Sequence, residues 1–253
     1  MFTGESDKAW KAYGRTEPYY GVLSDERFRK KHLTPRALEE FFRSGEQDLD
    51  FFLATIRRHF DPQFTPKRAL DFGCGVGRLT IPLARISSEV VAADVSTEMI
   101  AEAKRNCERR SISNVEFVQS DDRLSAVTGK FDFILSYIVF QHIPSRRSER
   151  ILRAILDRLA DGGFGCLHFN YTGPGSWARR VFHHARKIVP LLNNFANLME
   201  RKPFFAPMMQ MNRANLNRVF CRLQKCGCEN VIVRFTNHGN ELGLILFFKI
   251  PGA

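Results

Sequence analysis

Apolar and polar positions alternate along the middle of the chain in blocks typical of strands and helices that follow one another. Five short apolar runs have the length of buried strands, and the segments between them repeat apolar residues at helical spacing. The runs cover residues 68–73, 90–93, 115–118, 131–140 and 164–171, and the helical segments cover 78–87, 97–110 and 146–160. This alternation predicts an α/β fold with a doubly wound, mostly parallel sheet.

The N-terminal part of the chain departs from this alternation. Residues 1–35 carry many aromatic side chains with little periodicity, and Gly14, Pro18 and Gly21 interrupt any long helix. We therefore predict a loop and one short helix that fold over the main domain as an aromatic arm. The arm is expected either to cover a ligand or simply to anchor the terminus through its aromatic side chains.

A long helical segment follows the arm. Thr34 and Pro35 are typical of a helix N-cap and first helical residue. Apolar residues then recur at helical spacing up to Ile56, and Ser44-Gly45 is expected to divide the segment into two pieces.

The C-terminal third departs from the regular alternation of strands and helices. Residues 172–212 are basic and rich in proline, and we interpret them as an inserted lid. A helix over 215–226 and strands over 231–236 and 242–250 are predicted to follow. The connection between those two strands is too short for a helical crossover, so the pair should be antiparallel.

A glycine-rich loop lies between the first strand and the first helix. The stretch from Ala69 to Leu79 reads A-L-D-F-G-C-G-V-G-R-L, with three glycines at alternate positions. Glycines let a ligand approach the bare backbone, and the new helix offers unpaired N–H groups. A dinucleotide fingerprint requires glycine where Arg78 stands, so this loop favours another nucleoside-like ligand.

Acidic side chains stand at the carboxyl ends of the next two predicted strands. Asp94 ends the second strand, and Asp121 and Asp122 follow the third. Ligands of open α/β sheets bind at these strand ends. A carboxylate there can accept hydrogen bonds from ribose hydroxyls, a second can accept from an adenine amino group, and Met99 can pack on the purine.

The motif D-x-G-x-G-x-G after a strand, followed by Asp94 and Asp121, resembles the class I S-adenosylmethionine-dependent methyltransferases, in their small-molecule or sugar branch. This resemblance implies a seven-stranded sheet with the last strand antiparallel, a methyltransferase domain over residues 36–253, and S-adenosylmethionine as cofactor. It places the cofactor against the following residues: Asp71, Gly73, Cys74, Gly75, Gly77, Asp94, Val95, Met99, Asp121, Asp122, Ser136 and Tyr13. The Asn-Pro-Pro-Tyr motif of nucleobase amino-methyltransferases is absent.

Three histidines are candidates for acid–base chemistry. His142 follows the fourth strand and is our candidate general base for a hydroxyl acceptor, with structural support of the loop before Pro144 as the alternative. His168 lies inside the fifth strand and is expected to be a core residue, whereas His238 in the last hairpin could face the site. No metal-ligand cluster is evident, and the six cysteines form no paired C-x-x-C sets, so we predict no metal.

Positive charge concentrates in one region. The net charge is +11, and ten basic residues but one acidic residue lie between Pro174 and Lys225. Such a segment favours an anionic partner. The leading hypothesis is methylation, preferably on oxygen, of a small or medium anionic acceptor such as a sugar nucleotide or glycan. The alternatives are an RNA methyltransferase and a non-catalytic binding protein.

The sequence also indicates the compartment. No apolar run approaches the roughly 18 residues that span a bilayer, and residues 1–10 lack an apolar signal core. Because free thiols are typical of reducing compartments, we expect a cytoplasmic protein.

Overall fold

The computed structural model describes residues 4–172, 209–238 and 241–252. Seven strands form one sheet of order β3-β2-β1-β4-β5-β7-β6. In chain order they are β1 (Arg68–Phe72), β2 (Glu89–Asp94), β3 (Val115–Gln119), β4 (Phe131–Ser136), β5 (Leu159–Thr172), β6 (Val231–His238) and β7 (Glu241–Lys249). Neighbours pair in parallel except around β7, which is antiparallel to β5 and β6. The predicted α/β, doubly wound, seven-stranded sheet is therefore confirmed.

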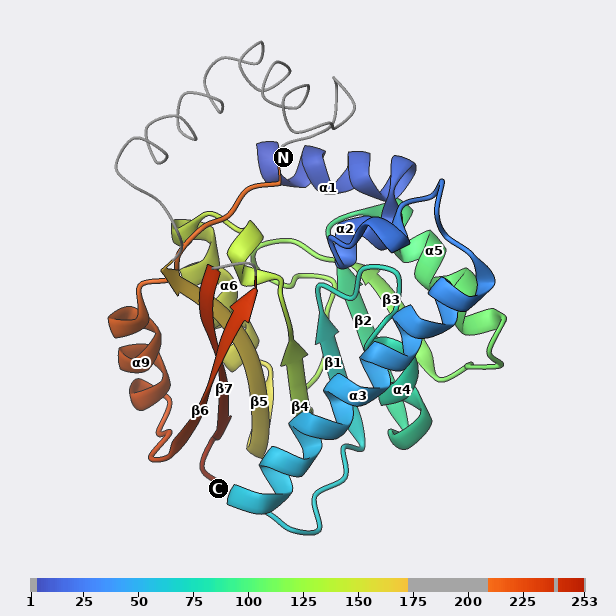
Figure 1. The fold of residues 1–253 in the computed structure, drawn as a ribbon. Coiled ribbons are helices and arrows are strands. Elements are labelled where there is room, and N and C mark those ends of the chain that lie inside the picture. The colour runs from blue at the N-terminus through green and yellow to red at the C-terminus, as the bar shows by residue number, and fades with distance from the viewer. Residues whose placement is uncertain (1–3, 173–208, 239–240, 253) are drawn as a thin grey trace.

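Helices cover both faces of the sheet (Figure 1). α3 (Pro35–His59) and α4 (Thr80–Ile86) contribute to the apolar core on one face. α6 (Ser145–Leu156) and α9 (Leu216–Lys225) contribute to the core on the other. Because the central strands are buried on both faces, they appear in the sequence as continuous apolar runs rather than as alternating patterns. α5 (Thr97–Glu108) connects β2 to β3.

The N-terminal arm is more helical than predicted. It forms α1 (Glu5–Thr16), α2 (Pro18–Val22) and the 3-10 helix η1 (Glu26–Phe28), and α1 crosses above the carboxyl ends of the strands (Figure 1). Gly14 does not interrupt α1. A Cβ at Gly14 would lie 2.8 Å from Ser96 Oγ and 2.9 Å from Glu98 Cβ. This glycine therefore serves the close contact between α1 and the start of α5.

The predicted break in α3 at Ser44-Gly45 was wrong, because α3 continues through 25 residues. Thr34 caps its first turn by accepting a hydrogen bond from the Ala37 N–H at 3.2 Å. Gly45 is buried, and a Cβ there would lie 2.1 Å from the Arg78 carbonyl oxygen. The glycine thus lets α3 approach the glycine-rich loop, which is a tertiary requirement that local sequence does not reveal.

Two boundaries also differ from the predictions. α6 ends at Leu156 and β5 starts at Leu159, so residues 159–163 belong to a strand and not to the end of a helix. Leu159 pairs with Phe131 before the register shifts, and the glycines at 162 and 163 lie within that irregular part of β5. β4 ends at Ser136, and the 3-10 helix η2 (Phe140–His142) follows it.

Most of the predicted basic lid, residues 172–212, lies outside the described residues. The described part re-enters at residue 209, where the Asn212 N–H donates to the Gln141 carbonyl at 2.6 Å and the Ala214 N–H donates to the Asn170 carbonyl at 2.7 Å. Within the three described ranges, we find no helix whose length and hydrophobicity would let it cross a membrane. The predicted division into an arm, a domain and a lid stays a prediction.

Candidate active site

The glycine-rich loop turns sharply after β1. Gly73, Gly75 and Gly77 have φ angles of +81°, +53° and +88°, in the left-handed region that favours glycine. A Cβ at Gly73 would lie 2.4 Å from the Val139 side chain, and one at Gly75 would lie 2.6 Å from that of Val22. The loop backbone is therefore held close to both the β4–η2 segment and α2.

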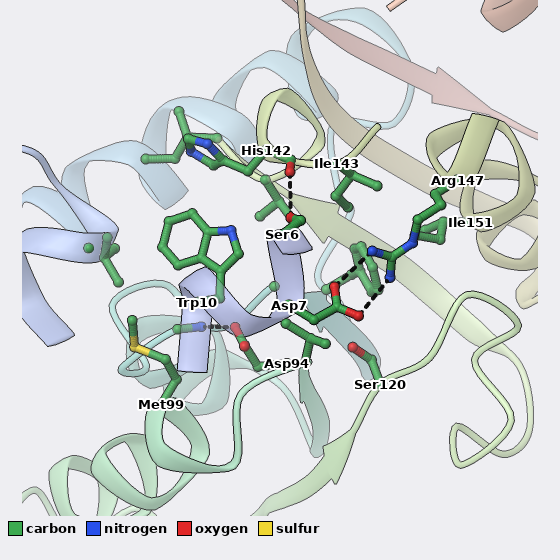
Figure 2. A pocket seen from close by; sticks show the side chains of 18 of the residues that line it. Ser6, Asp7, Trp10, Asp94, Met99, Ser120, His142, Ile143, Arg147 and Ile151 are labelled. Atoms are coloured by element: carbon green, nitrogen blue, oxygen red, sulfur yellow. Dashed lines mark hydrogen bonds and ion pairs between the residues drawn. The ribbon is translucent and has the colours of Figure 1, made fainter. Parts of the chain in front are cut away.

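A pocket lies between this loop, α1 and the carboxyl ends of β2, β3 and β4 (Figure 2). Eight predicted site residues line it: Gly73, Gly75, Asp94, Val95, Met99, Asp121, Asp122 and His142. Five predicted site residues do not: Asp71, Cys74, Gly77, Ser136 and Tyr13. Gly77 instead faces Ala103 of α5. The pocket thus gathers the ends of several strands, as the strand order predicts.

Asp94 joins the loop to the end of β2. Its Oδ2 accepts from the Gly75 N–H and its Oδ1 accepts from the Ser96 N–H, each at 2.9 Å. Burial raises the pKa of Asp94 from its ordinary value, and the backbone hydrogen bonds act in the opposite direction. Because a carboxylate offers about four lone-pair positions, Asp94 retains acceptor capacity for a ligand in the pocket beside its backbone hydrogen bonds.

Asp71 lies beneath the loop rather than in the pocket. It is 2% exposed and accepts a hydrogen bond from Thr80 Oγ1 at 2.6 Å. Burial raises the pKa of Asp71 to about 6. The contact connects β1 to the first turn of α4, so Asp71 stabilises the loop from below.

The two acids after β3 have different environments. Asp121 accepts from the N–H groups of Arg123 and Ser125 at 2.9 and 3.0 Å and so closes its own turn. Asp122 instead forms an ion pair with Arg147 of α6 at 2.7 Å. Arg147 also bonds to Asp7 of α1 at 2.8 Å (Figure 2). The two ion pairs together link α1, α6 and the end of β3.

The α1 residues of this pocket were missed by sequence reasoning. Trp10 lines the pocket, with its ring 4.8 Å from that of His142 between centroids. Ser6 Oγ donates to the His142 carbonyl oxygen at 2.8 Å. The aromatic content of the arm was the available signal, but it drew attention to the tyrosines. Tyr13 and Tyr19 are buried in the core, where the Tyr19 hydroxyl donates to Glu102 at 2.6 Å.

Both ring nitrogens of His142 are occupied by protein groups. The Nδ1–H donates to the Gln210 carbonyl oxygen at 2.8 Å, so Nε2 is left to accept from the Gln141 side-chain amide at 3.1 Å. Burial lowers the pKa of His142 to about 4. His142 is therefore neutral near pH 7 and holds the residue 209–212 segment against η2.

The segment after β4 carries backbone strain. Ile138 has a φ of +54°, which is a true outlier for a β-branched residue, and it lines the pocket beside Tyr137 and Val139. Strain of this kind concentrates at functional sites. Among the described residues, no group of three or more His, Cys, Asp or Glu side chains is arranged to hold a metal ion.

The sheet has the arrangement of the class I methyltransferase fold, with β7 antiparallel between β5 and β6 and a glycine loop facing an acid at the end of β2. Residues 69–163 match the family model described as "Methyltransferase domain". The chain therefore contains a methyltransferase domain over these residues, as the sequence resemblance predicted.

Curated relatives with different named functions match part of the chain. A ubiquinone biosynthesis O-methyltransferase from Ruegeria pomeroyi is 30% identical over 156 residues, which cover 61% of this chain and 60% of that protein. The 23S rRNA (uracil(1939)-C(5))-methyltransferase RlmD of Xanthomonas axonopodis is 34% identical over 97 residues, which cover 34% of this chain and 22% of that protein. The chain therefore spans only part of the length of these curated relatives.

A solved structure shares the fold over nearly the whole chain. Magnesium protoporphyrin IX methyltransferase from Synechocystis, solved with bound SAH, gives a TM-score of 0.62 at 18% identity. The alignment covers 97% of this chain and 99% of that one. At this identity the likeness establishes the fold alone.

Proposed function

We propose that this protein transfers a methyl group from S-adenosylmethionine to a small or medium acceptor, with oxygen as the preferred methylated atom. The observation that supports this most is Asp94, held between the glycine loop and α5 in a pocket at the carboxyl ends of the strands. In this proposal Asp94 binds the ribose hydroxyls, Met99 packs on the adenine, and the Gly73–Gly75 backbone lies along the methionine part.

We also propose roles for the other residues in and beneath the pocket. Asp121 lies near the adenine position, whereas Asp122 acts through Arg147, because that guanidinium occupies its carboxylate. Asp71 supports the loop through Thr80. We place Trp10, and not Tyr13, over the cofactor, since Trp10 lines the pocket.

The proposed class of acceptor is supported by a relative and by the distribution of charge, and not by the pocket. The named function of the Ruegeria relative favours a small-molecule acceptor and O-methylation. The anionic character of the acceptor rests on the basic residues between 174 and 225, of which six lie outside the described residues. We also propose a cytoplasmic location, since all six cysteines are free thiols.

Turnover tests this function directly. The protein is incubated with S-adenosylmethionine and a panel of hydroxyl compounds that includes sugar nucleotides and phenols, and S-adenosylhomocysteine is quantified. We expect formation of S-adenosylhomocysteine matched by a product heavier by one methylene unit. A protein that binds the cofactor but methylates no member of a broad panel would contradict the small-molecule assignment.

The rRNA-methylating relative supports a second candidate, an RNA acceptor. An RNA that neutralises six or more phosphates would lose about 10³-fold or more in affinity between 50 and 200 mM salt. Binding of a generic RNA is therefore measured across that range. Tight and steeply salt-dependent binding that disappears in an Arg179→Glu/Arg180→Glu protein would favour the RNA candidate over the small molecule.

A further inference from the structure

A second group of polar side chains gathers at the same edge of the sheet, beyond β4. Tyr137 follows β4, His168 and Asn170 lie near the end of β5, and Thr236 and His238 end β6. β7 is antiparallel to both β5 and β6, so β4, β5 and β6 all run in one direction and end at one edge. His168 and Asn170 are two residues apart on a strand and therefore share a face. We call these five residues the β4–β6 cluster.

Four members of the β4–β6 cluster are linked by direct contacts. The Tyr137 ring centroid lies 5.2 Å from that of His168 and 6.1 Å from that of His238, and the two imidazoles are 5.4 Å apart. His168 Nε2 lies 2.9 Å from Thr236 Oγ1. Because Tyr137 also lines the pocket around Asp94, the cluster adjoins the proposed cofactor site.

Three buried polar atoms of the cluster have no partner among the described residues. They are Nδ1 of His168, whose residue is 0% exposed, and Nδ2 and Oδ1 of Asn170, whose residue is 1% exposed. A buried polar atom left without a hydrogen bond costs about 1–3 kcal/mol, and native proteins contain few of them. Both donors and acceptors are unpaired here, which matches the hydrogen-bonding capacity of a hydroxyl group.

The rings of the cluster carry no charge near pH 7. Burial lowers the pKa of His168 to about 3 and raises the pKa of Tyr137 to about 12. Burial also lowers the pKa of His238. A neutral imidazole retains a lone pair that can accept a proton, whereas it offers little attraction to a phosphate or carboxylate.

The charged groups around the cluster do not give it a net attraction for anions. Asp48 and Arg78, the nearest on the α3 side, pair with each other at 2.6 Å. Glu241 of β7 is the register partner of His238, and burial raises its pKa. His142 acts on His168 as another neutral imidazole, and the Cys166 thiol near Tyr137 has its pKa raised by burial.

We propose that the β4–β6 cluster binds the reacting hydroxyl group of the acceptor, an alcohol or a phenol, and that His238 is the general base. The inference rests on the proposed methyl transfer. His168 and Asn170 hold the hydroxyl, and any anionic part of the acceptor binds elsewhere. His238 is exposed, so a proton that it accepts can pass to water, and its Nε2 has one hydrogen-bond contact within the described residues, with the Tyr137 hydroxyl at 3.5 Å, whereas both nitrogens of His142 are bonded at 3.1 Å or less.

In the reaction the acceptor hydroxyl gives its proton to the unprotonated ring nitrogen of His238. The hydroxyl oxygen uses its lone pair to form a bond to the methyl carbon of the sulfonium. The S–CH₃ bond breaks, and its electron pair stays on sulfur. The products are a methyl ether, an uncharged thioether and an imidazolium that releases its proton to solvent.

Hydroxyl binding is tested by NMR on protein with ¹⁵N-labelled histidines, saturated with S-adenosylhomocysteine. The uncharged probes are catechol and myo-inositol, and inorganic phosphate is the charged comparison. We expect at least one uncharged probe to shift the His168 and His238 signals, with His32 unmoved and with phosphate inactive at equal concentration. Asn170→Ala should weaken the probe at least fivefold while leaving S-adenosylhomocysteine affinity unchanged.

The outcomes separate this inference from the proposed function. Calorimetry with S-adenosylhomocysteine comes first, and failure to bind it refutes the proposed function and the cluster together. If it binds but neither uncharged probe shifts the two signals, only the cluster assignment is overturned. Shifts caused by phosphate would overturn the preference for an uncharged group.

The base is tested with the hydroxyl probe that binds and with S-adenosylmethionine. His238→Gln should lower the rate of methyl transfer about 10²–10⁴-fold, leave the KM of the probe within about twofold, and abolish the loss of rate at low pH. His32→Gln is the matched control and should keep the parent rate. A His238→Gln protein with the parent rate and pH profile, or a parent protein that binds the probe without methylating it, refutes the base.

Discussion

At the residue scale, the pocket depends on side chains whose hydrogen-bonding capacity is largely fixed by their neighbours. Asp94 accepts hydrogen bonds from backbone N–H groups on both oxygens and retains acceptor capacity for a ligand. His142 is fully engaged by Gln141 and the Gln210 carbonyl. The same residue type therefore has different roles at this edge of the sheet: His142 is bonded on both nitrogens, whereas His168 retains a free one.

Protonation of His142 should destabilise the protein in mild acid. The ordinary pKa of 6.5 holds in the unfolded chain, and burial lowers it to about 4 in the fold. The unfolded state therefore binds the proton more readily, and stability is lost as pH falls from about 6.5 to about 4. The loss amounts to at most about 3 kcal/mol.

A His142→Asn protein tests this assignment, because its amide can still donate to the Gln210 carbonyl. Melting temperatures are measured at pH 7 and pH 5 for the parent, for His142→Asn and for His32→Asn, which changes an exposed histidine. The parent and His32→Asn should lose more stability on acidification than His142→Asn. Equal losses in all three proteins would mean that His142 is not the titrating group.

At the element scale, two helices are fitted closely against neighbouring elements through a glycine. α3 lies against the loop through Gly45, and α1 lies against α5 through Gly14. Both glycines were expected to interrupt helices, because glycine is unfavourable inside a helix. Neither does so, since each removes a side chain at a point where another element passes within contact distance.

Replacing Gly45 by alanine should therefore destabilise the protein, although helix propensity alone would predict stabilisation. Gly→Ala in a helix interior normally stabilises by roughly 0.5–1 kcal/mol. Here the added methyl would lie 2.1 Å from the Arg78 carbonyl oxygen, so we expect Gly45→Ala to destabilise by about 1–3 kcal/mol. Urea unfolding measures the change, with Gly252→Ala as control because nothing lies within 4 Å of its Cβ position. A Gly45→Ala protein as stable as the parent would show that α3 is free to move.

The ion pair between α1 and α6 should slow cofactor release. Asp7 and Arg147 line the pocket and join α1 to the rest of the protein at 2.8 Å. Asp7→Asn leaves Arg147 with Asp122 alone, and we expect the dissociation rate of S-adenosylhomocysteine to rise about tenfold, corresponding to roughly 1.4 kcal/mol.

The control for this prediction is a second ion pair of the same helix. Arg15 bonds to Glu98 at 2.7 Å, but its side chain is 67% exposed, and such pairs contribute little. Arg15→Gln should change the dissociation rate less than twofold in stopped-flow measurements. Equal acceleration in both variants would indicate general loosening of α1, and no acceleration in Asp7→Asn would show that α1 does not limit release.

At the scale of the whole molecule, the sequence predicts the sheet better than the site. The apolar runs at 68–73, 90–93 and 115–118 mark β1 to β3 within about one residue, because strands buried on both faces leave a continuous apolar signal. The strand ends then locate Asp94 and Asp121 near the glycine loop. Trp10, Asp7 and Arg147 were missed because contacts over more than 100 residues of chain leave no local pattern.

Contacts between distant segments also explain the wrongly predicted ends of helices and strands. The helical segment was predicted to run to residue 160, but pairing of Leu159 with Phe131 draws the segment into β5. The strain at Ile138 and the unpaired atoms of Asn170 likewise become visible only when neighbouring strands are in place. These are the features from which the acceptor side of the site is inferred.

The central claim is that the pocket around Asp94 binds S-adenosylmethionine through this carboxylate. Calorimetric titration with S-adenosylhomocysteine tests it on the parent protein, on Asp94→Ala and on Asp161→Ala, which removes an exposed acid elsewhere. We predict binding to the parent and to Asp161→Ala, and a loss of roughly 1.5–3 kcal/mol in Asp94→Ala, which is the range for hydrogen bonds to a charged group. Unchanged affinity in a folded Asp94→Ala protein, or binding of NADH without S-adenosylhomocysteine binding, would contradict the account.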